Sequence, residues 1–296
     1  MNYAKKGVSK KIFLLLLLIV GLGLLINSQL AFLEFRYQPK DFSNAIVTSS
    51  HYPFAFKRKK VAGATMQYCQ LGTGDHLPVI VFVHGSPGSL AAYETYLKDS
   101  LLYRQAILIA VDRLGFGYSD FGKTIPSLQL QAKLIASILA DFPNSKKVLV
   151  GHSMGGPVNS RLAMDYPNLV DGMILVAPSI SPALEPSNWW RKLLNFPIIR
   201  WLTPPALRVC NQEIIPLKEE LLAMESRWKN ITCPVTIIQG TADQLVPAGN
   251  AQYAKEQLTN SKAVKLQMVK EGNHFILWSE VSLIREAILE MLKSIE

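Results

Sequence analysis

The sequence predicts an α/β protein built on a doubly wound, mostly parallel sheet, with a small helical segment inserted after the sixth strand. Short aliphatic and β-branched runs alternate with amphipathic stretches at helical spacing, which is the pattern of parallel strands joined by helices. About 260 residues follow the apolar N-terminal segment, a length that suffices for one sizeable core. The alternation breaks between Pro178 and Thr232, where no strand pattern occurs.

The strands of this sheet are predicted from apolar runs bounded by turn residues. Two early runs, near Tyr52–Phe56 and Thr65–Leu71, suit antiparallel edge strands. The six runs expected to pair in parallel are Pro78–Val83, Gln105–Val111, Lys147–Val150, Met173–Val176, Val235–Gln239 and Ala263–Val269. Within the inserted segment, the spacing from Leu217 to Trp228 predicts one amphipathic helix.

The N-terminus carries a positive cluster followed by an apolar run. Four lysines in the first eleven residues precede Ile12–Ile26, which is almost wholly apolar. No good small-x-small cleavage site follows, so residues 1–35 are predicted to be an uncleaved signal-anchor; a cleaved signal peptide with secretion and a buried core helix are the alternatives. The lysines predict a single-pass membrane protein with a cytoplasmic N-terminus and the rest of the chain outside, in the periplasmic or extracellular space. Residues 36–60 are then expected to form a basic juxtamembrane linker.

The formal net charge of +9 arises almost entirely near the N-terminus. The four N-terminal lysines and the basic run at 57–60 supply eight of these charges, so the remaining chain is nearly neutral. It has no basic stripe interleaved with aromatic residues, which argues against nucleic-acid binding. The run at 57–60 is expected to contact anionic lipid head groups or to form a solvated turn.

The cysteine and glycine patterns imply no cofactor and no metal. The three cysteines form no Cys-x-x-Cys pair, and no His and Cys cluster suggests a metal site. If the chain is exported, one disulfide can form and one thiol is left over. No phosphate-binding loop or dinucleotide fingerprint occurs.

A nucleophilic serine is predicted at Ser153. The strand Lys147–Val150 leads directly into the sequence GHSMG at residues 151–155, and helical spacing follows it. A serine on a tight strand-to-helix turn, with small residues two before and two after it, is a nucleophile elbow. The glycines permit a strained and closely packed backbone, and the turn lifts the hydroxyl clear of the sheet, where a base can reach it.

His274 is the predicted general base. A serine hydroxyl needs a neighbouring imidazole to take its proton at neutral pH. Of the five histidines, His274 lies in a loop between a strand-like run and the C-terminal amphipathic helix, as a catalytic base requires. The others are poorer candidates: His152 adjoins the serine and is expected to project away from it, and His84 ends an apolar run. The remaining two lie in early polar stretches.

Asp243 is the predicted partner of that imidazole. It follows the buried strand-like run Val235–Gln239 in a loop, at the end of the sheet where the serine is also expected. Asp165 lies near the end of the helix after the elbow, and Asp171 precedes a strand and so sits at the wrong end of the sheet. An Asx-turn or a cap is the alternative role for Asp243.

The sequence HGSPGS at residues 84–89 predicts an oxyanion hole. It forms a tight glycine- and proline-rich loop between a strand and a helix, which exposes the backbone N–H groups that a tetrahedral oxyanion needs. The expected donors are the N–H groups of Ser86 and of Met154, the residue after the nucleophile. An ordinary strand-to-helix turn is the alternative.

From about Val61 to the C-terminus the chain resembles the α/β-hydrolase superfamily. The His-Gly-x-Pro-Gly motif of that superfamily is matched at residues 84–88, and its Gly-x-Ser-x-Gly elbow at residues 151–155. The order Ser153, Asp243, His274 is the order expected for this superfamily, and residues 112–120 are similar to the loop after the next strand in many members. Epoxide hydrolases and haloalkane dehalogenases share the first motif but use an Asp nucleophile, so Ser153 argues against both activities.

The resemblance also implies a helical lid. It gives a hydrolase core at residues 61–182 and 233–296, with residues 183–232 inserted as a lid over the active site. Trp189, Trp190 and Trp201 in this insertion are expected to supply an apolar wall for an acyl or hydrocarbon substrate. The alternative is that these aromatic side chains attach the lid to the core.

These residues and the resemblance predict a serine hydrolase that cleaves carboxylic esters of a small or medium apolar substrate through an acyl-enzyme. A peptidase or amidase of the proline-iminopeptidase type is one alternative, although those enzymes usually carry a bulky aromatic residue in place of Met154. Carbon–carbon hydrolases and cofactor-free haloperoxidases, which share the Ser-Met-Gly elbow, are further alternatives, as is a non-catalytic binding protein. A small-molecule acyl substrate and the membrane are the expected partners, and the oligomeric state stays open.

Overall fold

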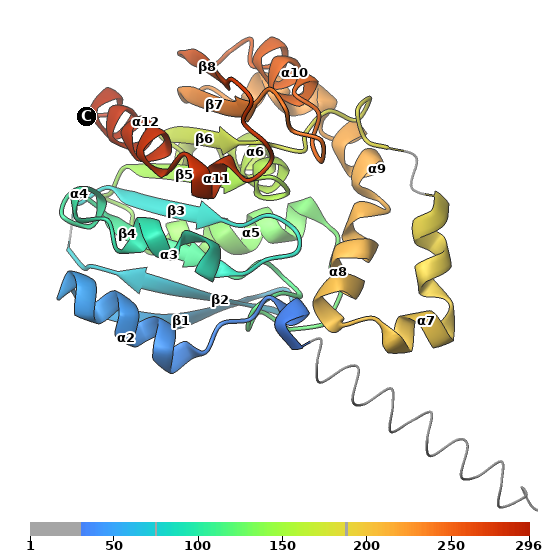
Figure 1. The fold of residues 1–296 in the computed structure, drawn as a ribbon. Helices are drawn as coiled ribbons and strands as arrows, with labels where there is room; N and C mark the ends of the chain where they lie inside the picture. Colours follow the sequence, from blue (N-terminus) through green and yellow to red (C-terminus); the bar gives the residue numbers. More distant parts are fainter. Residues whose placement is uncertain (1–30, 75, 187–188) are drawn as a thin grey trace, which may run out of the picture.

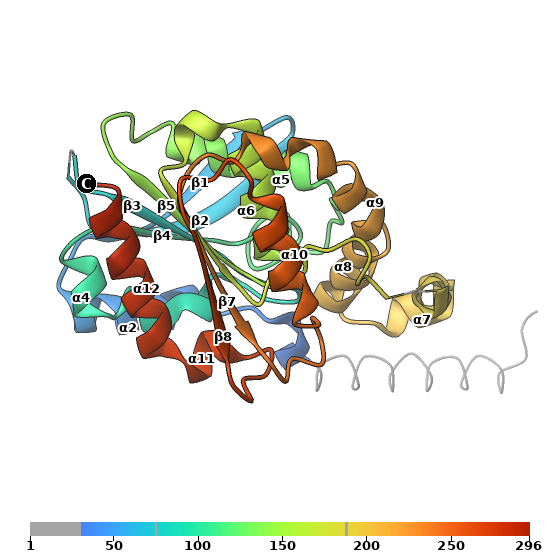
Figure 2. The same ribbon diagram turned by 90° about the horizontal axis from the view of Figure 1, so that it is seen from above.

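The fold is built on one mixed sheet of eight strands with helices on both faces (Figures 1 and 2). The computed structural model describes residues 31–296 apart from 75, 187 and 188. The strands are β1 (Phe54–Val61), β2 (Ala64–Leu71), β3 (Val79–Val83), β4 (Ile107–Val111), β5 (Lys147–His152), β6 (Gly172–Val176), β7 (Val235–Gly240) and β8 (Val264–Val269). Their order across the sheet is β1-β2-β4-β3-β5-β6-β7-β8; β1 and β2 are antiparallel to their neighbours and the rest pair in parallel. The predicted doubly wound α/β fold is confirmed.

Two layers of helices sandwich the sheet, as the view from above makes clear (Figure 2). One layer contains α5 (Leu128–Leu139), α6 (Gly155–Asp165) and α10 (Gly249–Gln257). The other contains α2 (Pro39–Ser50), α3 (Glu94–Leu97), α4 (Ser100–Tyr103), α11 (Ile276–Ser279) and α12 (Val281–Ser294). The inserted segment forms α7 (Pro197–Leu202), α8 (Pro205–Ile214) and α9 (Leu217–Leu222) beyond one edge of this sandwich (Figure 1).

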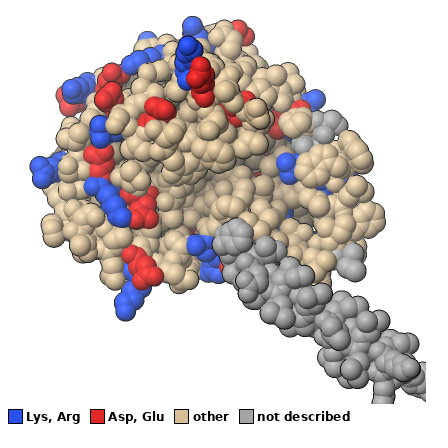
Figure 3. Space-filling model, in the orientation of Figure 1, with Lys and Arg blue, Asp and Glu red and all other residues tan. Residues whose placement is uncertain are grey.

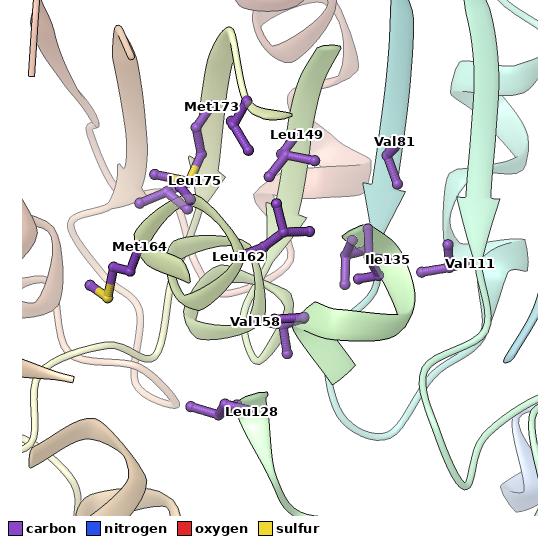
Figure 4. Close-up of a cluster of buried hydrophobic side chains, with 14 of the residues drawn as sticks. Val81, Val111, Leu128, Ile135, Leu149, Val158, Leu162, Met164, Met173 and Leu175 are labelled. Carbon is purple, nitrogen blue, oxygen red and sulfur yellow. The ribbon is translucent and has the colours of Figure 1, made fainter. Parts of the chain in front are cut away.

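Each layer of helices closes a separate apolar core. Alternate residues of β3 point to opposite faces, so Val81 joins the cluster under α5 and α6 while Ile80 joins the cluster on the other face. Figure 4 shows the first cluster, in which Ile135 of α5 and Leu162 of α6 pack towards strand residues such as Leu149. Each such fully buried aliphatic side chain contributes about 1.5–3 kcal/mol. These cores make the sheet a rigid base for the loops at its carboxyl edge.

The basic stretch at residues 36–60 is part of the fold, so its prediction as a juxtamembrane linker is wrong. Helix α2 buries Phe42 and Ile46 in the core, and β1 pairs along its whole length with β2. Phe54 and Phe56 alternate with outward-facing residues in β1 and pack against the core, which gives the segment its strand character. The cations belong to the first strand of the sheet, where Lys59 pairs with Asp141 at 2.6 Å; charges on an edge strand oppose pairing with another chain.

The described helices do not support the predicted membrane span. Among the described residues, no helix combines the length and the apolar character needed to cross a membrane, which overturns the predicted localisation as a single-pass membrane protein. Of the expected anchor only residues 31–35 are described, and Ala31–Glu34 among them form one short 3-10 helix. The apolar run Ile12–Ile26, from which the anchor was predicted, lies outside the described residues.

The inserted segment is helical, and its last helix is interrupted. The single helix predicted from Leu217 to Trp228 appears as α9 followed by a 3-10 helix at Glu225–Asn230. The chain tightens there because the backbone N–H of Met224 bonds to the carbonyl oxygen three residues earlier, at 3.0 Å. Leu217, Met224 and Trp228 nevertheless form one buried stripe, as the apolar periodicity predicts, so only the hydrogen-bond pattern differs.

Candidate active site

The predicted catalytic and oxyanion-hole residues converge at the carboxyl edge of the sheet. Parallel strands end at the same edge, so the loops after β3, β5, β7 and β8 meet there. A cavity of about 640 Å³ opens at this edge, and Ser86, Ser153, Met154 and His274 all line it. Figure 3 shows a mostly uncharged hollow near the middle of the molecular face that it draws. Apolar side chains supply much of the cavity wall; they include Leu184, Ile214, Leu217, Leu245, Phe275 and Trp278.

Ser153 occupies the strained turn between β5 and α6. Its backbone has a φ of +52°, in the left-handed region that non-glycine residues rarely adopt. Two hydrogen bonds fix this turn: the Ser153 N–H donates to the Val176 carbonyl at 2.9 Å, and the Ser153 carbonyl accepts from the Gly156 N–H at 2.9 Å. A side chain at Gly155 would bring a Cβ within 2.0 Å of the Val83 carbonyl oxygen. The turn therefore requires glycine at position 155 and holds the serine at the cavity wall.

His274 and Asp243 form a buried hydrogen-bonded pair. The distance from His274 Nδ1 to Asp243 Oδ2 is 2.8 Å. Because an ionised carboxylate can only accept, Nδ1 carries the proton and Nε2 is left with a lone pair. The imidazole is thus held in the tautomer that can accept a proton at the cavity.

The carboxylate of Asp243 is held by several donors. Its Oδ1 accepts from the backbone N–H groups of Leu245 (2.9 Å) and Val246 (2.8 Å), and its Oδ2 also accepts from Gln239 Nε2 at 3.1 Å. Burial alone raises the pKa of Asp243, but the hydrogen bonds from His274 and from these backbone groups lower it more, so its pKa lies below the ordinary value. The carboxylate stays ionised and keeps one orientation.

Two loops each bring one backbone donor to the same cavity: Ser86 lies after β3, and Met154 lies after β5. The N–H groups of Ser86 and Met154 have no protein acceptor in the part of the chain that the structure describes. Met154 immediately precedes α6, so its N–H lies at the positive end of the helix dipole, which favours a negative charge. The two groups that the sequence predicts as oxyanion donors therefore both border the cavity with free N–H groups.

His152 lies at the site, contrary to the expectation that it projects away. It lines the cavity, and its Nε2–H donates to the carbonyl oxygen of His274 at 3.0 Å. Its ring lies 4.9 Å from the His274 ring and 5.2 Å, edge-on, from Trp278. Burial, and then the neighbouring His274, lower the pKa of His152 to about 4, so the ring is neutral near pH 7. No local sequence signal identifies this contact, because it joins residues 122 positions apart.

The three tryptophans predicted as substrate-binding residues are not among the side chains found on the cavity wall. Trp189, Trp190 and Trp201 are 68%, 45% and 52% exposed. They belong to the 3-10 helix Trp189–Asn195 and to α7, on the outer side of the insertion, whereas α8 and α9 lie next to the core (Figure 1). The insertion contributes shorter aliphatic side chains to the cavity instead.

Comparison with known proteins relates the chain to hydrolases. The profile of the alpha/beta hydrolase fold family matches residues 78–198. Mouse monoglyceride lipase is 24% identical over 250 residues, which cover 73% of this chain and 81% of that protein. Human protein ABHD8 is 27% identical over 231 residues, covering 67% of this chain but only 51% of that protein, so the chain spans about half the length of that relative.

Solved structures have the same fold at lower identity. The crystal structure of a putative lipase from Acinetobacter baumannii AYE aligns with a TM-score of 0.60 and 18% identity, covering 86% of this chain and 96% of that one. An alpha/beta hydrolase fold protein from Burkholderia ambifaria aligns with a TM-score of 0.64 and 21% identity, covering 81% and 100%. At this level of identity the likeness establishes the fold.

Proposed function

The chain is a hydrolase of the α/β-hydrolase superfamily, and we propose that it cleaves carboxylic esters through an acyl-enzyme formed on Ser153. The observation that carries this proposal is the 2.8 Å hydrogen bond between His274 Nδ1 and Asp243 Oδ2, beside a cavity that Ser153 also lines. An ester substrate is supported by the relatives, since the mouse protein is a monoglyceride lipase and the Acinetobacter protein a putative lipase.

In the first half of the reaction, Ser153 Oγ attacks the ester carbonyl carbon. His274 Nε2 takes the hydroxyl proton, and Asp243 stabilises the imidazolium that forms. The carbonyl oxygen becomes an oxyanion, which accepts hydrogen bonds from the N–H groups of Ser86 and Met154. His274 then gives its proton to the leaving alcohol, and the acyl group stays on Ser153.

In the second half, water replaces the alcohol. His274 takes a proton from the attacking water, the same two N–H groups stabilise the second tetrahedral oxyanion, and Ser153 Oγ leaves with the proton returned by His274. The products are the carboxylic acid, the alcohol and the free enzyme. Every proton transfer is carried by one imidazole, which explains why its tautomer must be fixed.

The cavity suits a small or medium apolar substrate. Its volume of about 640 Å³ lies within the range of small-molecule sites, and Leu217, Val246 and Phe275 contribute apolar wall. Ile214 of α8 and Leu217 of α9 come from the insertion. We propose on this ground that residues 183–232 act as a lid on a core formed by residues 61–182 and 233–296.

The test is hydrolysis of p-nitrophenyl esters of graded acyl length by the full chain and by its Ser153→Ala variant. Turnover is expected in the wild type and is expected to vanish in the variant. Ser179→Ala is the matched control, because Ser179 also lines the cavity but its hydroxyl bonds to Glu185 at 2.6 Å; this variant should keep its turnover.

The other outcomes separate the alternatives. Labelling of Ser153 by a fluorophosphonate without ester turnover would indicate an activated serine with another substrate, such as a peptide or a carbon–carbon bond. A folded protein that neither turns over esters nor reacts with the fluorophosphonate would contradict the proposal and leave a non-catalytic binding protein.

A further inference from the structure

A fully buried arginine lies directly behind the proposed oxyanion hole. Arg113 follows β4, is 0% exposed, and engages all five of its N–H donors. Nη1 and Nη2 donate to the two carboxylate oxygens of Glu213 at 2.8 and 2.9 Å, and Nη1 also donates to Gln131 Oε1 at 3.1 Å. Nε donates to the His84 carbonyl at 2.8 Å and Nη2 to the Gly85 carbonyl at 3.1 Å. The guanidinium thus has one fixed position.

The contact with the Gly85 carbonyl bears on the proposed chemistry because of peptide geometry. The Gly85 carbonyl and the Ser86 N–H belong to one peptide unit, which is planar and trans, so the two bonds point in opposite directions. Holding the carbonyl oxygen from behind therefore fixes the direction of the N–H on the cavity side. Arg113 itself does not line the cavity.

His84 adds a second donor to the same carbonyl. His84 Nε2 accepts the backbone N–H of Arg113 at 2.9 Å, so the ring proton is on Nδ1, which lies 2.6 Å from the Gly85 oxygen. Burial, and then the charge of Arg113, lower the pKa of His84 well below its ordinary value, which keeps the ring in this neutral form. The Gly85 oxygen consequently accepts from one neutral and one charged donor.

The charged donor also strengthens the Ser86 N–H. A cation bonded to an amide oxygen draws electron density away from the amide nitrogen, and hydrogen bonds in such a chain polarise one another. The dipole of α6 makes the Met154 N–H a stronger donor, and the Arg113 guanidinium does the same for the Ser86 N–H through the Gly85 carbonyl.

Glu213 connects this arrangement to the insertion. It belongs to α8, and its ion pair with Arg113 is almost completely buried, with side-chain exposures of 0% and 3%. Two charges removed from water in this way must hold each other in good geometry, and loss of either leaves the other buried without compensation. Displacement of α8 would therefore disturb the group that holds the Gly85 carbonyl.

We propose that Arg113 is a positioning residue of the oxyanion hole, which it orients and polarises through the Gly85 carbonyl while Glu213 holds it from the lid. This inference rests on the proposed function. A positioning role for Arg113 differs from a purely structural ion pair in one respect. The stabilisation of a tetrahedral oxyanion depends on Arg113, while the binding of the planar ester does not.

The test compares two variants with the wild-type full chain. Arg113→Lys keeps the charge but replaces a planar fork of five donors by an ammonium with three, which cannot hold Glu213 and both carbonyls together. The double variant Arg113→Met/Glu213→Met removes the pair as a unit and leaves no buried charge, so it guards against misfolding of the single variant. Circular dichroism checks that both variants are folded.

The measured quantities are kcat and KM for a p-nitrophenyl ester and the inhibition constant of a trifluoromethyl ketone, which adds to Ser153 as a tetrahedral oxyanion. We expect kcat and the affinity for the ketone to fall by the same factor, about tenfold to a hundredfold, somewhat less than the loss of a whole oxyanion donor. KM should stay within about twofold, because the planar ester does not use the oriented N–H. Arg161→Lys is the matched control: Arg161 pairs with Asp165 on α6 at 2.6 Å, with exposures of 8% and 12%, and should leave all three constants unchanged.

Three results would overturn the inference: folded variants with wild-type kcat and ketone affinity, a loss of kcat without a loss of ketone affinity, or an equal loss in Arg161→Lys. Failure of the proposed function is detected separately, by measuring ester hydrolysis and reaction with a fluorophosphonate in the wild type and in Ser153→Ala. If the wild type neither hydrolyses esters nor reacts with a fluorophosphonate, or if ester hydrolysis persists in Ser153→Ala, the proposed function fails and the inference falls with it.

Discussion

Replacement of Asp243 by Asn tests the tautomer of the imidazole, because the surrounding hydrogen bonds dictate how the amide must lie. Two backbone N–H groups, of Leu245 and Val246, donate to Oδ1, so the amide oxygen must occupy that position. The NH₂ group then takes the place of Oδ2 and faces His274 Nδ1, where a donor meets a donor. The ring must move its proton to Nε2, and it can no longer accept the proton of Ser153.

The expected loss is large and specific to catalysis. In a Ser-His-Asp triad the same exchange lowers kcat by about ten-thousandfold, which is about 5.5 kcal/mol of transition-state stabilisation. The assay is kcat for a p-nitrophenyl ester at neutral pH, with folding checked by urea unfolding. Asp171→Asn is the control: Asp171 accepts the Lys147 N–H at 2.9 Å at the opposite end of β5 and should leave kcat unchanged. A folded Asp243→Asn variant with kcat within about tenfold of wild type would refute the reasoning.

The stability of the same variant should depend on pH in one direction. Because the pKa of Asp243 lies below its ordinary value in the folded protein, its carboxylate stabilises the fold above the ordinary carboxyl pKa. This contribution is lost as the pH falls through the folded pKa. The difference in unfolding free energy between wild type and Asp243→Asn should therefore shrink in acid, and a difference that grows there would contradict the assignment.

Three further changes test other parts of the site. A Gly85→Ala side chain would lie 2.9 Å from Ser153 Cβ and 3.0 Å from His152 Nδ1, so we expect kcat to fall by at least about tenfold; an unchanged kcat would mean that the loop can shift freely. The pKa of His152 falls from 6.5 to about 4 on folding, so protonation of the unfolded chain should cost the wild type about 3 kcal/mol of unfolding free energy as the pH falls from 6.5 to 4. In urea titrations His152→Gln should lose correspondingly less. Ile214→Trp fills part of the cavity, so the variant should prefer shorter acyl chains. For longer chains kcat/KM should fall roughly fourfold for each methylene that the cavity no longer holds. An unaltered chain-length profile would show that acyl chains bind elsewhere.

The fold could be predicted because the central strands are buried on both faces. All five residues of β3 are buried, and such strands appear in a sequence as short aliphatic runs that need no alternation. The candidate site followed from the same runs, since Ser153, Asp243 and His274 were chosen as residues that come directly after a strand. A loop position after a parallel strand is a local property, and the topology then brings such loops together at one edge.

The features that were missed depend on partners far apart in the chain. Arg113 and Glu213 lie 100 positions apart, and the local sequence around either residue does not identify the other as its partner. For β1 the sequence predicts an edge strand only near Tyr52–Phe56, because the basic run at 57–60 hides the continuation of the strand and favours a linker. The tryptophans are expected at the substrate because they are apolar and lie in an insertion that the resemblance places over the active site, whereas the path of the chain decides which side of an insertion faces the cavity.

The measurement that tests the central claim most directly is a peptide mass map of the full chain after reaction with a fluorophosphonate. The account predicts a single phosphonyl adduct on Ser153, absent from Ser153→Ala and formed far more slowly in His274→Ala, because the imidazole activates the hydroxyl. Folded protein without an adduct, or with the adduct on another residue, would contradict it.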